Sequence, residues 1–117
     1  MWKVTNMSHN EIINKIELLF QEAEHLPANK KQLFLRHLND LKKELNNLPS
    51  KKNEQAKSIA NFTNLAANES LRKDKDPVLL DLSLKGLEAS IRDFETSHPV
   101  LTENTYSFIN LLSNLGV

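Results

Sequence analysis

Leucine-rich stripes with a helical repeat constrain the fold of this chain more than any other feature. In three segments, large side chains recur at alternating steps of four and three, which places them on one face of an α-helix. The stripes are Phe34, Leu38, Leu41, Leu45 and Leu48; Leu80, Leu84, Leu87, Ile91 and Phe94; and Leu101, Thr105, Phe108, Leu112 and Leu115. No stripe lasts beyond about two heptads, so the pattern predicts a small antiparallel bundle rather than a coiled coil.

Capping residues and prolines divide the chain into five predicted helices. Ser8-His9-Asn10-Glu11 has the form of a capping box, and Asp76-Pro77 has that of an N-cap followed by proline in the first turn. We therefore expect helices over residues 8–25, 28–47, 53–72, 77–96 and 99–115. The helix over 53–72 has a weaker apolar face, made of Ala56, Ile59, Ala60, Leu65 and Ala66.

The chain length and the spacing of the helices predict one all-α domain over residues 8–117. The first two and the last two helices have short connections, so each pair should form an αα-hairpin. Residues 1–7 show no helical periodicity of apolar residues and are expected to be a disordered N-terminal lead segment. Residues 72–77 are expected to form a flexible linker. Gly86 interrupts a predicted helix, which indicates close packing against a neighbouring helix.

Several kinds of catalytic site are excluded by composition. The chain has no Cys, so it has no disulfide, thiolate metal site or cysteine nucleophile. Its two glycines, Gly86 and Gly116, are too far apart for a phosphate-binding loop, and no serine lies in a G-x-S-x-G elbow. We expect a protein that is not an enzyme and that has no cofactor.

Two Glu-x-x-His pairs leave a metal-binding alternative open. Glu22 and His25 form one pair, and Glu95 and His98 form the other, with the spacing that di-metal helical bundles use. His98 precedes Pro99 and should therefore lie at a helix boundary, where it would not project into a bundle core. We expect no metal site, and convergence of the two pairs in one pocket would reverse that expectation.

Charge is unevenly distributed along a chain whose formal net charge is zero. Residues 28–57 contain eight Lys or Arg against three Asp or Glu, whereas residues 76–117 contain two against six. The candidate basic surface consists of Lys30, Lys31, Arg36, Lys42, Lys43, Lys51 and Lys52. Weak nucleic-acid binding through the basic helix 28–57 is one alternative, although this stretch lacks an aromatic residue outside the apolar stripe for base stacking. We expect instead that the basic helix lies against acidic neighbours, in the same chain or in a partner.

Neither a secretory signal nor a membrane span is expected, because the chain has no apolar run of the required length. A cytoplasmic location follows as the default. Three short apolar stripes on a bundle of this size are only partly covered within one chain. The sequence therefore predicts a non-enzymatic helical module for protein–protein interaction or oligomerisation, with self-association or a protein partner.

The chain end carries a distinctive pattern. Phe94-Glu95-Thr96-Ser97-His98-Pro99-Val100-Leu101 is followed by Leu111-Leu112-Ser113-Asn114-Leu115-Gly116-Val117. These segments resemble a family of small bacterial proteins known as a domain of unknown function, whose members have a Phe-Glu-x-x-His-Pro-x-Leu turn and a Leu-x-x-x-Gly-Ile/Val end. The resemblance implies an all-helical cytoplasmic bacterial protein and carries no activity. Physically, we expect Phe94 and Leu101 to be buried, Ser97 to cap the last helix and Pro99 to stiffen the turn.

Overall fold

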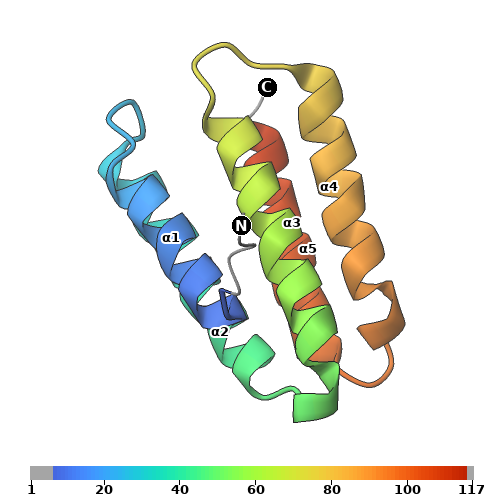
Figure 1. Ribbon diagram of the computed structural model, residues 1–117. Helices are drawn as coiled ribbons and strands as arrows, with labels where there is room; N and C mark the ends of the chain where they lie inside the picture. Colours follow the sequence, from blue (N-terminus) through green and yellow to red (C-terminus); the bar gives the residue numbers. More distant parts are fainter. Residues whose placement is uncertain (1–6, 116–117) are drawn as a thin grey trace, which may run out of the picture.

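Five α-helices, running alternately up and down, make up the computed structural model, which describes residues 7–115 (Figure 1). They are α1 (His9–Gln21), α2 (Ala28–Asn46), α3 (Asn53–Leu71), α4 (Pro77–Ile91) and α5 (Pro99–Leu115). Two 3₁₀ turns, η1 (Ser50–Lys52) and η2 (Arg92–Phe94), precede α3 and follow α4. Residues 7–115 contain no strand, and the predicted all-α fold is confirmed.

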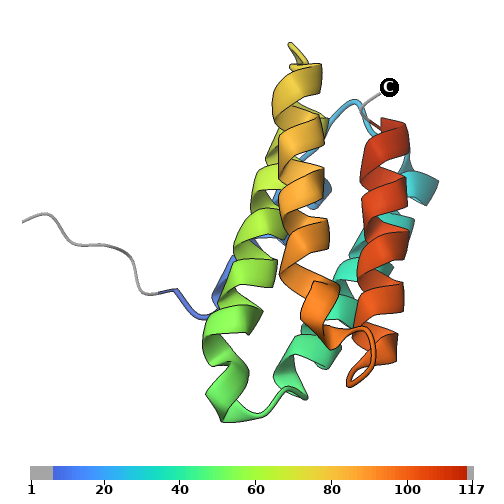
Figure 2. The same cartoon turned by 90° about the vertical axis from the view of Figure 1, so that its right-hand side faces the viewer.

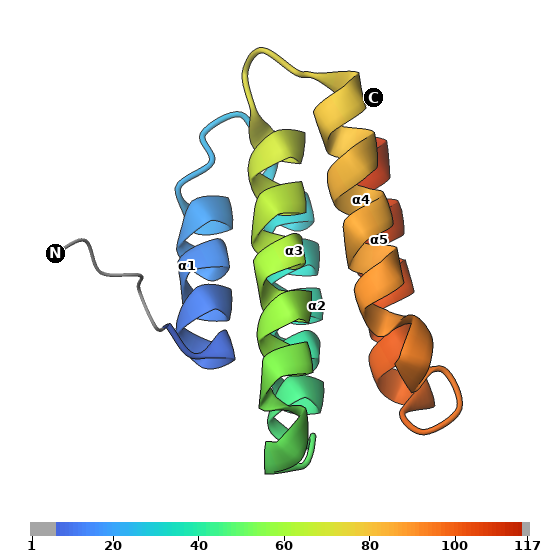
Figure 3. The ribbon, with the colours of Figure 1, turned by 45° about the vertical axis from the view of Figure 1, so that its right-hand side comes forward.

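The helices form two layers. α1, α3 and α4 lie side by side in one layer, and α2 and α5 form the other (Figure 3). The predicted hairpins are present, because α1 packs on α2 and α4 packs on α5. The most extensive contact, however, joins α3 to α4, and α3 also touches α1 and α5. The segment with the weakest predicted face is therefore the central helix of its layer.

Both predicted N-terminal caps are present. The Ser8 hydroxyl accepts the Glu11 N–H at 3.2 Å, and the Glu11 carboxylate accepts the Ser8 N–H at 3.1 Å. Asp76 Oδ1 accepts the N–H groups of Val78 and Leu79 at 3.1 and 3.2 Å. Each cap occupies backbone donors that the helix itself leaves free, which fixes where α1 and α4 begin.

Two helices end several residues earlier than predicted. We expected the first helix to reach residue 25, but α1 ends at Gln21, which lets the chain turn so that Leu26 enters the core. Pro27 also disfavours helical backbone at Leu26. We expected the fourth helix to reach residue 96, but α4 ends at Ile91 and tightens into η2, where Phe94 is buried. The ends at residues 46 and 71 differ from prediction by one residue, and α5 has the predicted bounds.

The buried face of α3 is made of small residues. Four of the five residues predicted on this face are buried, namely Ala56, Ile59, Ala60 and Ala66. Leu65 is 47% exposed, so its assignment to the core face was wrong. Thr63, Ala67 and Ser70 complete the buried face instead. The Thr63 hydroxyl donates to the Ile59 carbonyl at 2.7 Å and the Ser70 hydroxyl to the Ala67 carbonyl at 2.9 Å, so neither buried hydroxyl lacks a partner.

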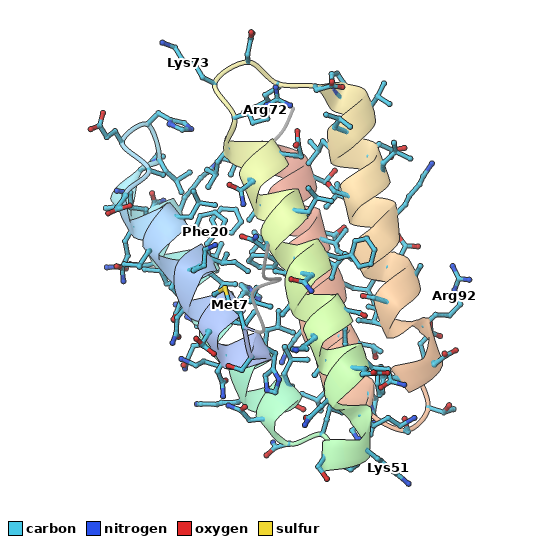
Figure 4. The ribbon with its side chains drawn as sticks, in the orientation of Figure 1. Met7, Phe20, Lys51, Arg72, Lys73 and Arg92 are labelled. Carbon is cyan, nitrogen blue, oxygen red and sulfur yellow. The ribbon has the colours of Figure 1, made fainter. Side chains whose placement is uncertain are left out.

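Three aromatic rings join the two layers in the core. Phe20 of α1 stacks on Phe34 of α2 with ring centroids 4.5 Å apart. Phe108 of α5 meets both rings edge-on, at 6.2 Å and 5.8 Å. The Phe20 side chain points into the interior in Figure 4. Edge-to-face and offset contacts of this kind add stability beyond the burial of apolar area.

The segments predicted to be irregular are only partly described by the structure. Residues 1–6 lie outside the described residues, and Met7, which we placed in the lead, packs against the core. Between α3 and α4, the Lys75 ammonium donates to the carbonyls of Ser70 and Arg72 at 2.9 and 3.2 Å, which closes the end of α3.

Over residues 7–115, no helix has both the length and the apolarity that a membrane crossing requires.

Candidate interaction face

α4 lies at the edge of its layer with its outer side uncovered. Figure 2 shows α4 in front, with α3 on one side and α5 on the other. Val78 and Leu82 on this side are 66% and 58% exposed. A helix that is apolar around its whole circumference is normally buried on all sides. α4 approaches that composition, because Val78, Leu79, Leu80, Leu82, Leu84 and Leu87 fall within ten positions of one another.

The exposed apolar side of α4 continues onto α3. Phe62 and Leu65 of α3 are exposed, as is Leu79 of α4. Phe62 packs directly over Gly86, because a Cβ atom on Gly86 would lie 2.5 Å from the Phe62 ring. α3 and α4 run antiparallel, so Leu65 lies one turn from Phe62 toward the level of Leu82. We call the set Phe62, Leu65, Val78, Leu79 and Leu82 the α3–α4 face.

Small side chains bring the two helices of this face close together. Gly86 has no Cβ atom, and Ser83, one turn earlier on α4, has a small side chain that is buried. The Ser83 hydroxyl donates to the Leu80 carbonyl at 2.8 Å, so this polar group is satisfied within its own helix. The prediction that Gly86 marks close packing against a neighbouring helix is confirmed, and the neighbour is α3 through Phe62.

One ion pair borders the α3–α4 face. Lys85 Nζ lies 3.0 Å from Asp81 Oδ2, one turn away on α4, and both side chains are largely exposed. Asp81 and Lys85 lie on the side of Leu82 away from α3, whereas Leu79 and Gly86, two turns apart, lie on the side toward α3. The face therefore has an apolar flank and a charged flank.

The α3–α4 face was not predicted from the sequence, although the sequence contains a signal for it. The predicted stripe of the fourth helix accounted for Leu80, Leu84 and Leu87, and all three lie on its inner side, buried or half-buried. Val78, Leu79 and Leu82 fall outside that stripe. They are surplus apolar residues on a helix that already has a core face, and such a surplus predicts a second contact surface.

The chain-end motif forms a structural corner between α4 and α5. Phe94 and Leu101 are buried, as predicted. The His98 ring meets the Phe94 ring edge-on, with ring centroids 5.5 Å apart. The backbone N–H of His98 donates to the backbone carbonyl of Phe94 at 2.8 Å. The Ser97 hydroxyl lies 2.9 Å from His98 Nδ1. Because α5 begins at Pro99, His98 occupies the cap position and Ser97 lies one residue before it. The Ser97 hydroxyl contacts the His98 ring, so the prediction that Ser97 caps α5 was wrong.

Two further contacts hold this corner. The Tyr106 hydroxyl donates to the Glu95 carboxylate at 3.2 Å. Loss of hydration and the Glu95 carboxylate both raise the pKa of the Tyr106 phenol. Lys52 Nζ lies 5.9 Å from the centroid of the Phe94 ring, within the range of a cation–π contact. Gly116, the remaining residue of the motif, lies outside the described residues.

The two Glu-x-x-His pairs are not brought together. Glu22 and His25 lie in the connection after α1, and Glu95 and His98 lie in the connection after η2. Figure 1 shows these connections at opposite ends of the bundle. In the part of the chain that the structure describes, no three His, Asp or Glu residues are arranged to hold a metal ion. The convergence that would have favoured the metal-binding alternative is not found.

The predicted basic residues are spread along the molecule. The Lys31 ammonium donates to the Gln21 carbonyl at 3.0 Å and so closes the end of α1. Lys42 Nζ lies 2.6 Å from Asn14 Oδ1 and 3.9 Å from Glu17 Oε1, both on α1. Lys42–Glu17 is the kind of pairing with an acidic neighbour that we predicted. Lys30, Arg36, Lys43 and Lys51 are exposed, and η1 lies at the other end of α2 from Lys30.

A hollow of about 400 Å³ lies where the α1–α2 and α3–α4 connections meet. It is lined by Glu24, His25, Arg72, Lys73 and Lys75. Two of its three cationic side chains already have partners, because Arg72 pairs with Glu69 at 2.9 Å and Lys75 donates to backbone carbonyls. Figure 4 shows Arg72 and Lys73 at this end of the bundle. These contacts fix the end of α3 rather than present a free cluster of cations.

The comparisons with known proteins point to a family rather than to an activity. The curated proteins and the solved structures contain no match to the chain. The predicted resemblance to an uncharacterised domain is confirmed, because a family model described as "domain of unknown function (DUF4404)" matches residues 34–117. That span covers most of α2 and all of α3, α4 and α5, and the chain therefore belongs to this family.

Proposed function

We propose that this protein is a non-enzymatic helical module that associates with a second copy of itself through the α3–α4 face. The observation that carries the proposal is the exposure of Val78 and Leu82 on an edge helix that is apolar on most of its circumference. Covering these side chains removes apolar surface from water, which is the main driving force of protein association. We place this association in the cytoplasm, on the sequence argument given above.

The chemistry of the face favours a second copy as the partner. Its apolar side chains come from two adjacent helices, so the surface is broad enough to receive a helix of a facing molecule. Its charged flank contains Asp81, Lys85 and Glu88, and within it the Asp81–Lys85 pair is one that a second copy can complement. The chain has a formal net charge of zero, so two copies approach without long-range repulsion.

Light scattering coupled to size exclusion tests this proposal over micromolar to millimolar concentration. The wild-type mass should rise from 13.4 kDa toward twice that value as the concentration increases. Leu82→Asp should remain monomeric, because it places a charge in the centre of the face. Leu82 is already exposed in the single chain, so the fold should be retained, and far-ultraviolet circular dichroism checks this.

Leu18→Asp is the matched control. Leu18 is 54% exposed on α1, comparable to Leu82, but lies on another helix and outside the α3–α4 face. This variant should associate as the wild type does. A wild-type chain that stays monomeric over the whole range overturns the proposal. Equal loss of association in Leu18→Asp and Leu82→Asp would show that the α3–α4 face is not the contact.

A further inference from the structure

We infer that the two copies meet with their α4 helices antiparallel about a two-fold axis, so that Asp81 of each copy lies beside Lys85 of the other. The inference rests on the proposed self-association and specifies the partner's arrangement. Two-fold contacts are self-complementary, because residue i of one copy meets residue j of the other and the reverse holds as well. An acidic and a basic residue one turn apart on the same helix satisfy that condition.

The positions along α4 set the level of the axis. In an antiparallel pair, Asp81 lies opposite the partner's Lys85 when the axis passes at the level of Ser83. The two Leu82 side chains are then separated by two residues along the helices, or about 3 Å of axial rise, and lie at the centre of the contact. Val78 lies farther out, where it meets the later turns of the partner's α4.

The two flanks of α4 are compatible with this symmetry. A two-fold axis perpendicular to two antiparallel helices keeps each flank on its own side of the pair. The charged flank, with Asp81 and Lys85, therefore meets the charged flank of the partner. The apolar flank, where Leu79 adjoins Phe62 and Leu65 of α3, meets the apolar flank of the partner. A parallel two-fold pair would instead place the charged flank of each copy against the apolar flank of the other, where the charged side chains lose water without gaining a partner.

Charge-reversal variants isolate the contact between copies. Asp81→Lys and Lys85→Asp should each weaken self-association about tenfold, because each turns two symmetry-related attractions into repulsions. An equimolar mixture of the two variants should form a heterodimer about as tight as the wild-type dimer. Both variants lack the Asp81–Lys85 pair within their own helix, so recovery in the mixture can come only from contacts between chains. Sedimentation equilibrium of each variant and of the mixture measures these affinities.

Cysteine cross-linking tests the register independently, because the natural chain has no Cys. Leu82→Cys should form an intermolecular disulfide under mild oxidation. Val78→Cys should not, because the two Val78 positions are separated by ten residues along antiparallel helices, or about 15 Å, beyond the reach of a disulfide. Cross-linking of both variants would indicate parallel helices and overturn the inferred arrangement.

The outcomes separate this inference from the function on which it rests. If Leu82→Asp is monomeric while neither charge variant nor their mixture differs from the wild type, the antiparallel arrangement is wrong and self-association through the face stands. If the wild-type chain is monomeric at every concentration, both fail. Preferential heterodimer formation, together with cross-linking at residue 82 alone, establishes the antiparallel two-fold contact.

Discussion

Polar residues are tolerated in the interior of this bundle because their side-chain hydroxyl groups form hydrogen bonds within their own helices. Thr63, Ser83 and Thr105 are buried, and each donates its hydroxyl to a carbonyl three or four residues earlier in its own helix, at 2.7, 2.8 and 2.8 Å. A buried hydroxyl with such a partner avoids the cost of an unsatisfied polar group. These residues can therefore occupy positions of an apolar stripe, as Thr105 does in the third predicted stripe.

The capping box of α1 gives a prediction for the pH dependence of stability. The hydrogen bond from the Ser8 N–H lowers the pKa of the Glu11 carboxyl in the folded chain. A lowered folded-state pKa contributes stability above the unfolded-state pKa, and that contribution is lost as the pH falls through the folded-state value. The wild type should thus be more stable than Glu11→Gln at neutral pH, and the difference should vanish in acid.

Urea unfolding midpoints from pH 7 down to pH 2 measure this difference. Glutamine keeps a side-chain oxygen that can accept the Ser8 N–H, but it does not titrate over this range. The comparison therefore isolates the carboxylate charge from the hydrogen bond itself. Midpoints that decline in parallel for both proteins would show that the charge of Glu11 contributes nothing to the cap.

At the scale of helices, the sequence pattern predicted where each helix lies and which side of it is buried better than it predicted which helices pack against one another. The stripes on α2, α4 and α5 define the core faces because a period of 3.6 residues depends only on one helix. The central place of α3 could not be predicted in this way. Its buried residues are mostly alanines, which give a weak pattern, yet their small size is what allows α1, α4 and α5 to pack around it.

The same limit explains why the candidate face was not predicted. The stripe on α4 shows which side faces the core, but not whether its other side is covered by another helix. Val78 and Leu82 could have packed beneath a neighbour, and only the arrangement of the helices shows that they do not. Leu65 was assigned to the core for a related reason, since its apolar character alone does not distinguish the core from a contact surface.

The contact between α3 and α4 gives the second prediction. Alanine is favoured over glycine inside a helix by about 1 kcal/mol, but a Cβ atom at residue 86 would lie 2.5 Å from Phe62. Gly86→Ala should therefore stabilise a chain that carries Phe62→Ala by about 1 kcal/mol. In the wild-type background the gain should be smaller or reversed, because the Phe62 ring must move.

A double-mutant cycle by urea unfolding measures this coupling. All four proteins are compared at one dilute concentration at which each is monomeric, so that association does not enter the free energies. Ala89→Gly serves as the control, because Ala89 is exposed on α4 and its substitution should cost the same in both backgrounds. Equal effects of Gly86→Ala with and without Phe62 would show that the ring does not limit the approach of α4.

For the whole molecule, the aromatic core ties the first helix to the rest of the bundle. The family model matches residues 34–117, so α1 lies outside the matched span. Phe20 is nevertheless fully buried between Phe34 and Phe108, which belong to α2 and α5. α1 is thus part of the same core as the matched helices, and the chain should unfold as one cooperative unit.

Phe20→Ala tests whether α1 unfolds together with the other helices. The substitution removes a buried ring from a tightly packed cluster and should lower the free energy of unfolding by about 3–5 kcal/mol. Phe62→Ala is the matched control, because Phe62 is 37% exposed and its loss leaves no enclosed cavity in the core, so its cost should be clearly smaller. Urea unfolding followed by circular dichroism measures both values. If α1 is only an appendage, Phe20→Ala will melt a small part of the helical signal first and leave the main transition in place. A single transition shifted to lower urea would instead show that the stability of the matched helices depends on the α1 ring packed between them.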